Sequence, residues 1–397
     1  MSQTNIRPLS AYEPPATAEN LKAVCKEVEQ AIQYSTPTGR SHYSKVDVIL
    51  VNWEAEDRST TEELQCLESL FSWYGYNVEW YCIPSQFTRG HGEVQSRFLH
   101  WAMGTSDELK IFVYSGHARV SSEGEFHLYA NSSIFSPAVN FNYVIRYSMI
   151  TTYSDVLLVM NCCFASTVSL APNMELLAAS AGNEITPTPE SAVSFPKVMH
   201  AAMRSFGGNQ YTVAELHSMI MRANVTAATP VYVQRGTHKD GSILLPNLQR
   251  RTDEPPPKLF NQAEDDRILA SIRNNRERYV LIKVTLSTAP TLASAEEFYR
   301  WLSTDMPSHV NDISLEGVFS GSGVLLIRLP VAVWSGIRDN STFSFVCFVS
   351  SSNLMVPESS RRRLQDRKVN ELGAVLIYLT RRIVWRNCSA RESRNGF

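Results

Sequence analysis

Two short apolar runs, each ending in a small polar cluster, most constrain how this chain can fold. The first, residues 109–114, leads into a Ser-Gly-His-Ala cluster that contains His117. The second, residues 155–160, leads into an Asn-Cys-Cys cluster that contains Cys162 and Cys163. Such runs are typical of buried strands. Functional groups gather at the carboxyl ends of strands in open α/β sheets, so we expect a histidine and a cysteine pair at one sheet edge.

The chain around these runs alternates between strand-like and helix-like patterns. Strands are predicted at residues 46–51, 76–83, 109–114, 155–160, 175–179 and 229–233. Helical periodicity is found at residues 18–34, between 60 and 75, and at 94–103, 138–147, 195–206 and 212–223, and a short hairpin is expected at 123–129. This alternation predicts an α/β fold with a mostly parallel six-stranded sheet and helices on both faces. Pro230 places the last strand at a sheet edge.

A second region, with a different order of predicted strands and helices, follows a polar, proline-rich stretch. Strands are predicted at 279–286, 313–319, 324–329 and 343–349, and helices at 294–302 and 331–337. This β-α-β-β-α-β order predicts an α+β ferredoxin-like domain. The expected organisation is a flexible tail (1–18), an α/β domain (19–247), a linker with a charged helix at 262–274 (248–277), the ferredoxin-like domain (278–352) and a basic tail with one helix (353–397).

Composition excludes several classes of protein. The seven cysteines have no repeating spacing, which argues against a disulfide scaffold. The formal net charge of −2 over 397 residues gives no overall case for a nucleic-acid partner, and binding through the basic tail after residue 357 is kept as a third, less favoured hypothesis. No run approaches the roughly 20 apolar residues of a membrane span. No spacing of His and Cys suggests zinc, so neither a metal nor a cofactor is expected. We expect a cytoplasmic protein, with the nucleus as the alternative because of the Arg-rich run 361–363.

The two polar clusters together contain the parts of a cysteine-based acyl-transfer site. A cysteine thiolate is a nucleophile, and a nearby histidine can take the thiol proton and later protonate the leaving amine. The turn at residues 116–118 carries the small residues Gly116 and Ala118 on either side of the histidine, and would let backbone N–H groups approach a substrate carbonyl. Because neighbouring strand residues point to opposite faces, only one of Cys162 and Cys163 can meet His117.

The order and spacing of these motifs resemble the caspase-like clan of cysteine peptidases, which includes caspases, metacaspases, paracaspases and their fungal relatives. Residues 115–118 resemble the clan's Ser-Gly-His-Gly motif, and residues 161–165 resemble its Asp-x-Cys cluster. Caspases carry the histidine about 50 residues before the cysteine, and here the separation is 46 residues. Further similarity is found in residues 49–54, 75–78, 195–203, 211–217 and 229–233.

The resemblance implies a cysteine endopeptidase with a His117/Cys163 dyad and a thioester acyl-enzyme. Cys163 is the implied nucleophile because the clan's nucleophile follows the acidic position, here Asn161, by two residues; Cys162 is then expected in the core. The backbone N–H groups of Ala118 and Cys163 would form the oxyanion hole. Four further residues are the implied substrate-binding candidates: Asp57, Arg58, Ser115 and Asn161.

Two departures from the clan's pattern leave a second hypothesis open. Asn161 stands where metacaspase-like members carry an aspartate that recognises a basic P1 side chain, and Ala118 replaces a glycine. An amide pairs less strongly than a carboxylate with Arg or Lys. The alternative is therefore a catalytically impaired caspase-like module that uses its ferredoxin-like domain to bind a protein partner. Some relatives are activated by calcium, and no acidic residues of this sequence are assigned to that role.

Overall fold

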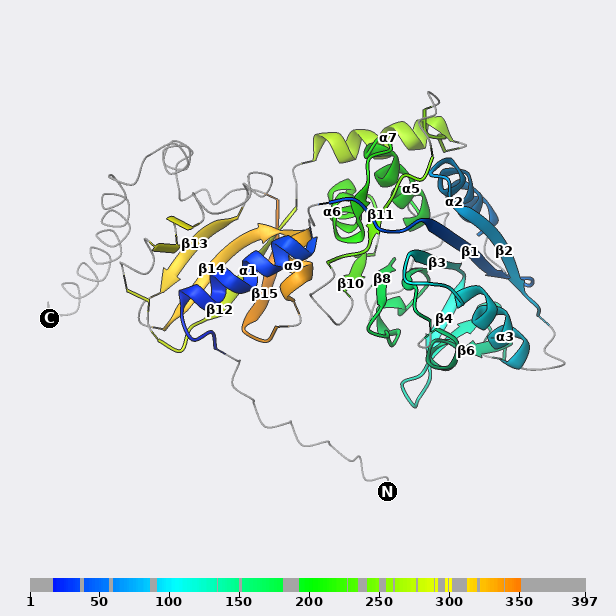
Figure 1. The fold of residues 1–397 in the computed structure, drawn as a ribbon, viewed down its shortest axis with the longest axis horizontal. Helices are drawn as coiled ribbons and strands as arrows, with labels where there is room; N and C mark the ends of the chain where they lie inside the picture. The colour runs from blue at the N-terminus through cyan, green and yellow to red at the C-terminus, as the bar shows by residue number, and fades with distance from the viewer. Residues whose placement is uncertain are drawn as a thin grey trace, which may run out of the picture. The chain divides into compact units, whose positions relative to one another are not determined.

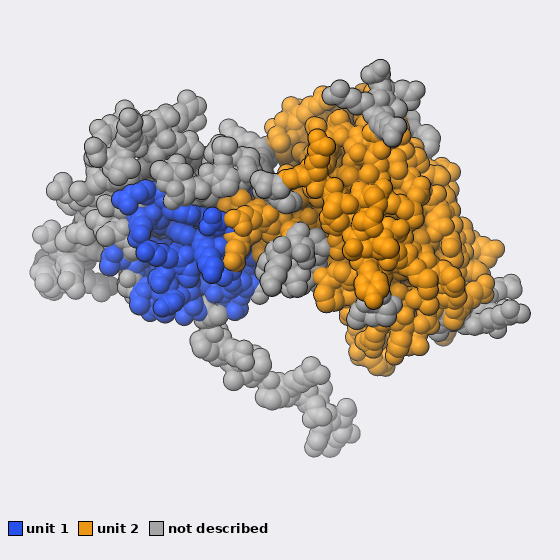
Figure 2. All heavy atoms as spheres, in the orientation of Figure 1, with its two compact units in different colours: residues 1–29, 279–330, 337–397 blue, residues 30–278, 331–336 orange. Residues whose placement is uncertain are grey.

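The computed structural model describes residues 17–350 except for short gaps, and its contacts divide the chain into two compact units (Figure 2). The gaps are residues 36–38, 57–59, 86–90, 134, 150–151, 181–192, 227, 235–240, 250–254, 260, 276–277, 289, 292–296, 299, 302–312, 320–321 and 339. Unit 1 consists of residues 1–29, 279–330 and 337–397, and unit 2 of residues 30–278 and 331–336. The boundary between the units falls inside helix α1 (Leu21–Ser35). The domain limits expected from the sequence stay predictions.

Unit 2 is built on a six-stranded sheet with the strand order β10-β8-β7-β3-β1-β2 (Figure 1). Its strands are β1 (Lys45–Trp53), β2 (Asn77–Ile83), β3 (Glu108–Ser115), β7 (Asp155–Asn161), β8 (Met174–Ala178) and β10 (Val231–Val233). Neighbouring strands are parallel except for β10, which runs antiparallel to β8 at the edge. The prediction of a mostly parallel six-stranded sheet in a mixed α/β fold is confirmed.

Helices cover both faces of this sheet, and each face has its own hydrophobic core. The helices of the first core are α2 (Thr61–Trp73), α5 (Phe195–Ser205), α6 (Val213–Ala223) and α7 (Gln262–Asn274). Those of the second core are α3 (His91–Ala102) and α4 (Phe141–Val144). Alternation along the strands assigns side chains to the two cores: Ile111 and Val113 of β3 lie in the first, and Phe112 and Tyr114 in the second.

Two small sheets complete unit 2, and sequence patterns identified them only in part. One contains β4 (His117–Val120), β5 (Phe126–Tyr129) and β6 (Ala138–Asn140), and the other pairs β9 (Tyr211–Thr212) with β11 (Leu244–Leu245). The helix predicted at 138–147 is wrong in its first three residues, which form β6. The Asn140 side chain accepts a 2.9 Å hydrogen bond from the Tyr143 amide, so it caps α4 and delays the start of the helix. A π-helical turn, Ile145–Met149, follows.

Unit 1 contains a four-stranded antiparallel sheet with the order β13-β14-β12-β15. Its strands are β12 (Tyr279–Thr285), β13 (Ser314–Phe319), β14 (Val324–Pro330) and β15 (Phe343–Val349). Helix α9 (Val331–Ile337) lies between β14 and β15 in sequence, but its residues 331–336 belong to unit 2. Most of the helix predicted at 294–302 lies outside the described residues, as does the tail 353–397. The ferredoxin-like assignment therefore stays a prediction. In the described part of the chain no helix is long and apolar enough to cross a membrane.

Candidate active site

The carboxyl ends of β3 and β7 lie side by side and bring the two polar clusters together. In the parallel register, Ser115 is the partner of Asn161, and the Gly116 amide donates a 3.3 Å hydrogen bond to the Asn161 carbonyl oxygen. His117 and Cys163 each lie two residues beyond this last pair. Both residues therefore lie just beyond the carboxyl ends of neighbouring strands, at the edge of the sheet where the sequence predicted them.

His117 begins β4, and its ring and backbone are both held. Its Nε2 atom lies 3.2 Å from Oε1 of Glu56, a residue of the loop after β1. The Glu56 side chain is only 4% exposed, whereas the His117 side chain is 21% exposed. The hydroxyl of the buried Tyr114 donates a 2.8 Å hydrogen bond to the His117 carbonyl oxygen. Glu56 thus contacts the Nε2 atom of the imidazole, and the His117 side chain is partly exposed.

The two adjacent cysteines have different environments. Cys162 is fully buried in the second core, and its carbonyl oxygen accepts a hydrogen bond from Ser180. The expectation that Cys162 packs in the core is confirmed. Cys163 is half-buried, and its thiol makes no hydrogen bond among the described residues. Of the pair, the position that sequence spacing favours as nucleophile is the more accessible one.

A strained turn follows Cys163. Phe164 has φ 58° and ψ 18°, a left-handed conformation that bulky residues rarely adopt. The Thr167 amide and hydroxyl both donate hydrogen bonds to the Phe164 carbonyl oxygen, at 3.0 and 2.8 Å, and stabilise this turn. The turn redirects the chain directly after Cys163, two residues beyond the end of β7. Strain of this kind clusters at functional sites.

Ser115 and Asn161, which the resemblance implied as substrate-binding residues, are buried beneath the edge. Both side chains hydrogen-bond Oε2 of the buried Glu63 in α2, each at 2.9 Å. Strand alternation explains this, because the odd-numbered positions of β3 and β7 face α2 and the first core. The two side chains thus contact Glu63 and are not open to a bound substrate in this structure.

The other predicted site residues are placed less directly. Ala118 lies in β4 opposite Leu128, and its methyl group is buried in the second core. Its side chain therefore packs away from solvent. Asp57 and Arg58 lie outside the described residues. No group of three or more His, Cys, Asp or Glu side chains in the described part of the chain could hold a metal ion.

Two carboxylates at this site were missed by the sequence patterns. Glu56 lies within a charged loop, where nothing distinguishes it from neighbouring acidic residues. Glu63 carried a usable signal, because it shares a helical stripe with Leu67 and Leu70 at spacings of four and three residues. A charged residue on an apolar stripe is buried only with partners, and here the partners come from β3 and β7.

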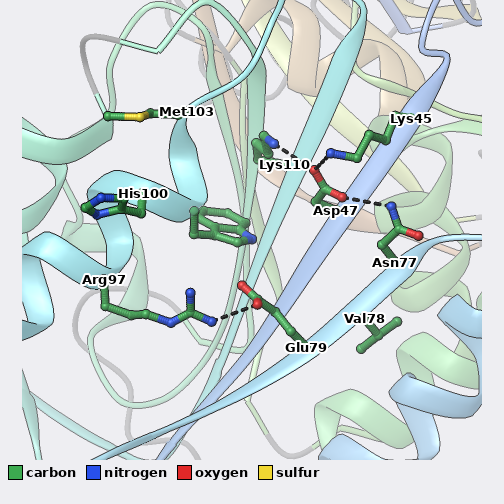
Figure 3. A pocket seen from close by; sticks show the side chains of 10 residues that line it. Lys45, Asp47, Asn77, Val78, Glu79, Arg97, His100, Met103 and Lys110 are labelled. Carbon is green, nitrogen blue, oxygen red and sulfur yellow. Dashed lines mark hydrogen bonds and ion pairs between the residues drawn. The ribbon is translucent and has the colours of Figure 1, made fainter.

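A cavity of about 340 Å³ opens at the opposite edge of the sheet, near the amino ends of β1, β2 and β3 (Figure 3). In it Asp47 pairs with Lys45 and Lys110, each at 2.7 Å, and Glu79 pairs with Arg97 at 2.7 Å. Burial raises the pKa of Asp47, but hydrogen bonds from Lys110 and Lys45 outweigh this and hold the pKa below its ordinary value. These charges neutralise one another, and the cavity is remote from His117 and Cys163.

No family model and no curated protein matches the chain. Among solved structures, the chain is similar to the Drosophila initiator caspase Dronc at 12% identity and a TM-score of 0.34, over 51% of this chain and 82% of that one. It is also similar to a protein of Geobacter sulfurreducens at 11% identity and a TM-score of 0.37, over 49% of this chain and 94% of that one. At these TM-scores neither likeness establishes a shared fold.

Proposed function

We propose that this chain is a caspase-like cysteine endopeptidase in which Cys163 is the nucleophile and His117 the general base. The observation that supports the proposal most strongly is the register of β3 and β7, which pairs Ser115 with Asn161. Because His117 and Cys163 each follow this pair by two residues, both come after the same edge of the sheet. The burial of Cys162 leaves Cys163 as the accessible thiol of the pair. Burial also raises the pKa of the Cys25 thiol to about 12, which makes it a poor nucleophile at neutral pH.

The chemistry proceeds by acyl transfer to sulfur. His117 takes the thiol proton of Cys163, and the thiolate attacks the carbonyl carbon of a peptide bond. The C–N bond then breaks as the imidazolium gives its proton to the departing amine, and a thioester remains. His117 next takes a proton from water, whose oxygen attacks the thioester, and the thiolate leaves and recovers the proton as the acid product departs.

Backbone groups are proposed to stabilise the oxyanion, and buried side chains to support the site. The N–H groups of Ala118 and Cys163 are the proposed oxyanion donors, as the resemblance implies. Ser115 and Asn161 hydrogen-bond Glu63, so we assign them to holding the strand ends together and not to contacting the substrate. The substrates are proteins or peptides. Position 161 carries an amide where the resemblance implies an aspartate, and this amide binds the buried carboxylate of Glu63.

Covalent labelling tests the proposal. The full chain is incubated with peptidyl chloromethylketones carrying Arg, Lys, Asp or Leu at P1, with and without calcium, and adducts are located by peptide mass spectrometry. We expect labelling of wild-type protein that is lost in Cys163→Ala. The matched control Cys162→Ala removes a neighbouring, buried thiol, so it should keep the label while losing about 1 kcal/mol of stability.

A negative result is equally informative. If none of the four probes labels folded wild-type protein, with or without calcium, the endopeptidase proposal is overturned. The same holds if Cys163→Ala is labelled as fast as wild type. Either result would favour the alternative, a catalytically impaired caspase-like module that binds a protein partner.

A further inference from the structure

We propose that Glu56 is a positioning residue that orients the His117 imidazole for Cys163, so that the site is a Cys-His-Glu triad. This inference rests on the proposed function and extends it to a residue that the sequence patterns did not identify. It starts from the 3.2 Å contact between Glu56 Oε1 and His117 Nε2. A carboxylate at this distance from an imidazole nitrogen fixes both the ring orientation and the position of its proton.

The loop after β1 forms a turn that brings the Glu56 carboxylate to His117. The Glu56 amide donates a 3.4 Å hydrogen bond to the Trp53 carbonyl oxygen, which closes a turn directly after the strand. The neighbouring Glu54 is exposed and accepts a hydrogen bond from the Ser85 amide at 3.2 Å. Two carboxylates of one loop therefore have separate partners, and only that of Glu56 reaches His117.

Gly116 makes this approach possible. A Cβ atom built on residue 116 would lie 2.4 Å from Oε2 of Glu56 and 2.6 Å from the hydroxyl oxygen of Tyr114. Real Cβ atoms essentially never show such short distances, so the Glu56 carboxylate and the Tyr114 hydroxyl would have to shift if residue 116 carried a side chain. The Tyr114 hydroxyl also donates a hydrogen bond to the His117 carbonyl oxygen. The two groups that lie close to Gly116 therefore contact His117, Tyr114 at its backbone and Glu56 at its ring.

The chemical consequence concerns which nitrogen serves the thiol. With Nε2 directed at Glu56, a proton on Nε2 is stabilised by the carboxylate, and Nδ1 carries the lone pair that accepts the Cys163 proton. When that proton arrives, the ring becomes an imidazolium, and the buried carboxylate stabilises the positive charge. Because the Glu56 side chain is only 4% exposed, little water screens this interaction.

Three variants and two measurements test the inference. Glu56→Gln keeps the shape and removes the charge, Glu56→Ala removes both, and Glu54→Gln is the control in the same loop. We expect the rate of Cys163 labelling to fall about tenfold in Glu56→Gln and about a hundredfold in Glu56→Ala, at unchanged probe affinity. Glu54→Gln should label at the wild-type rate. Circular dichroism verifies that each variant is folded. If Glu56→Ala does not fold, the labelling rate of Glu56→Gln tests the inference.

The second measurement does not depend on reactivity. Nitrogen-15 NMR of histidine-labelled protein, with the His117 signals assigned by their loss in His117→Ala, reports the ring tautomer. We expect a proton fixed on Nε2 in wild type and in Cys163→Ala, and mixed tautomers in Glu56→Ala. If wild type does not react with any probe but its tautomer is fixed by Glu56, the endopeptidase proposal fails and the positioning role stands. An unchanged His117 tautomer in Glu56→Ala would overturn the role of Glu56, whatever the labelling rates.

Discussion

The side-chain amide of Asn161 donates a 2.9 Å hydrogen bond to the buried carboxylate of Glu63. The same amide donates a 2.8 Å hydrogen bond to the Ser115 hydroxyl, which in turn donates to Glu63 at 2.9 Å. All three side chains are at most 1% exposed. A buried carboxylate needs donors around it, so the contacts of Asn161 give a physical reason for an amide, and not a second carboxylate, at the last position of β7.

The first prediction concerns the substitution Asn161→Asp. It removes two donated hydrogen bonds and sets a second carboxylate against Glu63, where like charges raise one pKa until a proton is shared. We expect a loss of about 3 kcal/mol in the free energy of unfolding at pH 8. The loss should be smaller at pH 5, where the shared proton is bound more readily. Urea denaturation at the two pH values measures it.

The matched control is a double variant that again has one carboxylate and one amide at positions 63 and 161. In the double variant Glu63→Gln with Asn161→Asp, the charge and the donor exchange positions. We expect its stability at pH 8 to lie within about 1 kcal/mol of wild type, because interacting sites are not additive. Additive losses from the two single substitutions would show that the contact between the two side chains is not what stabilises the strand ends.

The second prediction concerns Gly116→Ala. The added methyl group would displace Glu56 and Tyr114, which lie 2.4 and 2.6 Å from its position. We expect the rate of Cys163 labelling to fall at least tenfold, because a misplaced base costs far more rate than stability. Gly92→Ala in α3 is the control, since a Cβ there meets no atom within 4 Å. Equal labelling rates in the two variants would contradict the prediction.

The third prediction concerns His200 and acid stability. His200 lies fully buried in α5, and neither ring nitrogen has a hydrogen-bond partner among the described residues. Burial, with a smaller contribution from Arg204, lowers its pKa from 6.5 to about 3. The unfolded chain therefore takes up this proton near pH 6.5, and the folded chain only near pH 3. Stability from the neutral ring is fully present above pH 6.5 and is lost as the pH falls toward 3.

The measurement compares wild type with His200→Leu. Between pH 7 and pH 4.5, His200 should account for about 2.5 kcal/mol of lost unfolding free energy, since one pKa unit corresponds to about 1.4 kcal/mol. In His200→Leu this part of the loss should be absent, so urea denaturation should show a shallower decline with acid. Parallel declines in the two proteins would mean that the ring is already accessible to protons when folded.

The sequence by itself determined the elements and the faces they present. Short apolar runs predicted all six strands of the main sheet, and the charged helix predicted at 262–274 has the bounds of α7. Strand alternation restricted the pair Cys162 and Cys163 to one candidate, and the burial of Cys162 agrees with it. These features are local, because period and burial are set by residues a few positions apart. Short strands such as β4 were missed, since four residues carry too little periodicity.

Only the tertiary structure decided which side chains meet. Glu56 reaches His117 across 61 positions, and Glu63 reaches Asn161 across 98, because β1, β3 and β7 are neighbours in the sheet. No local pattern encodes such pairings: they depend on strand order, on register and on the room left by Gly116. The sequence therefore identified a histidine and a cysteine at one edge. The fold supplied the two carboxylates, one beside the histidine and one beneath the strand ends.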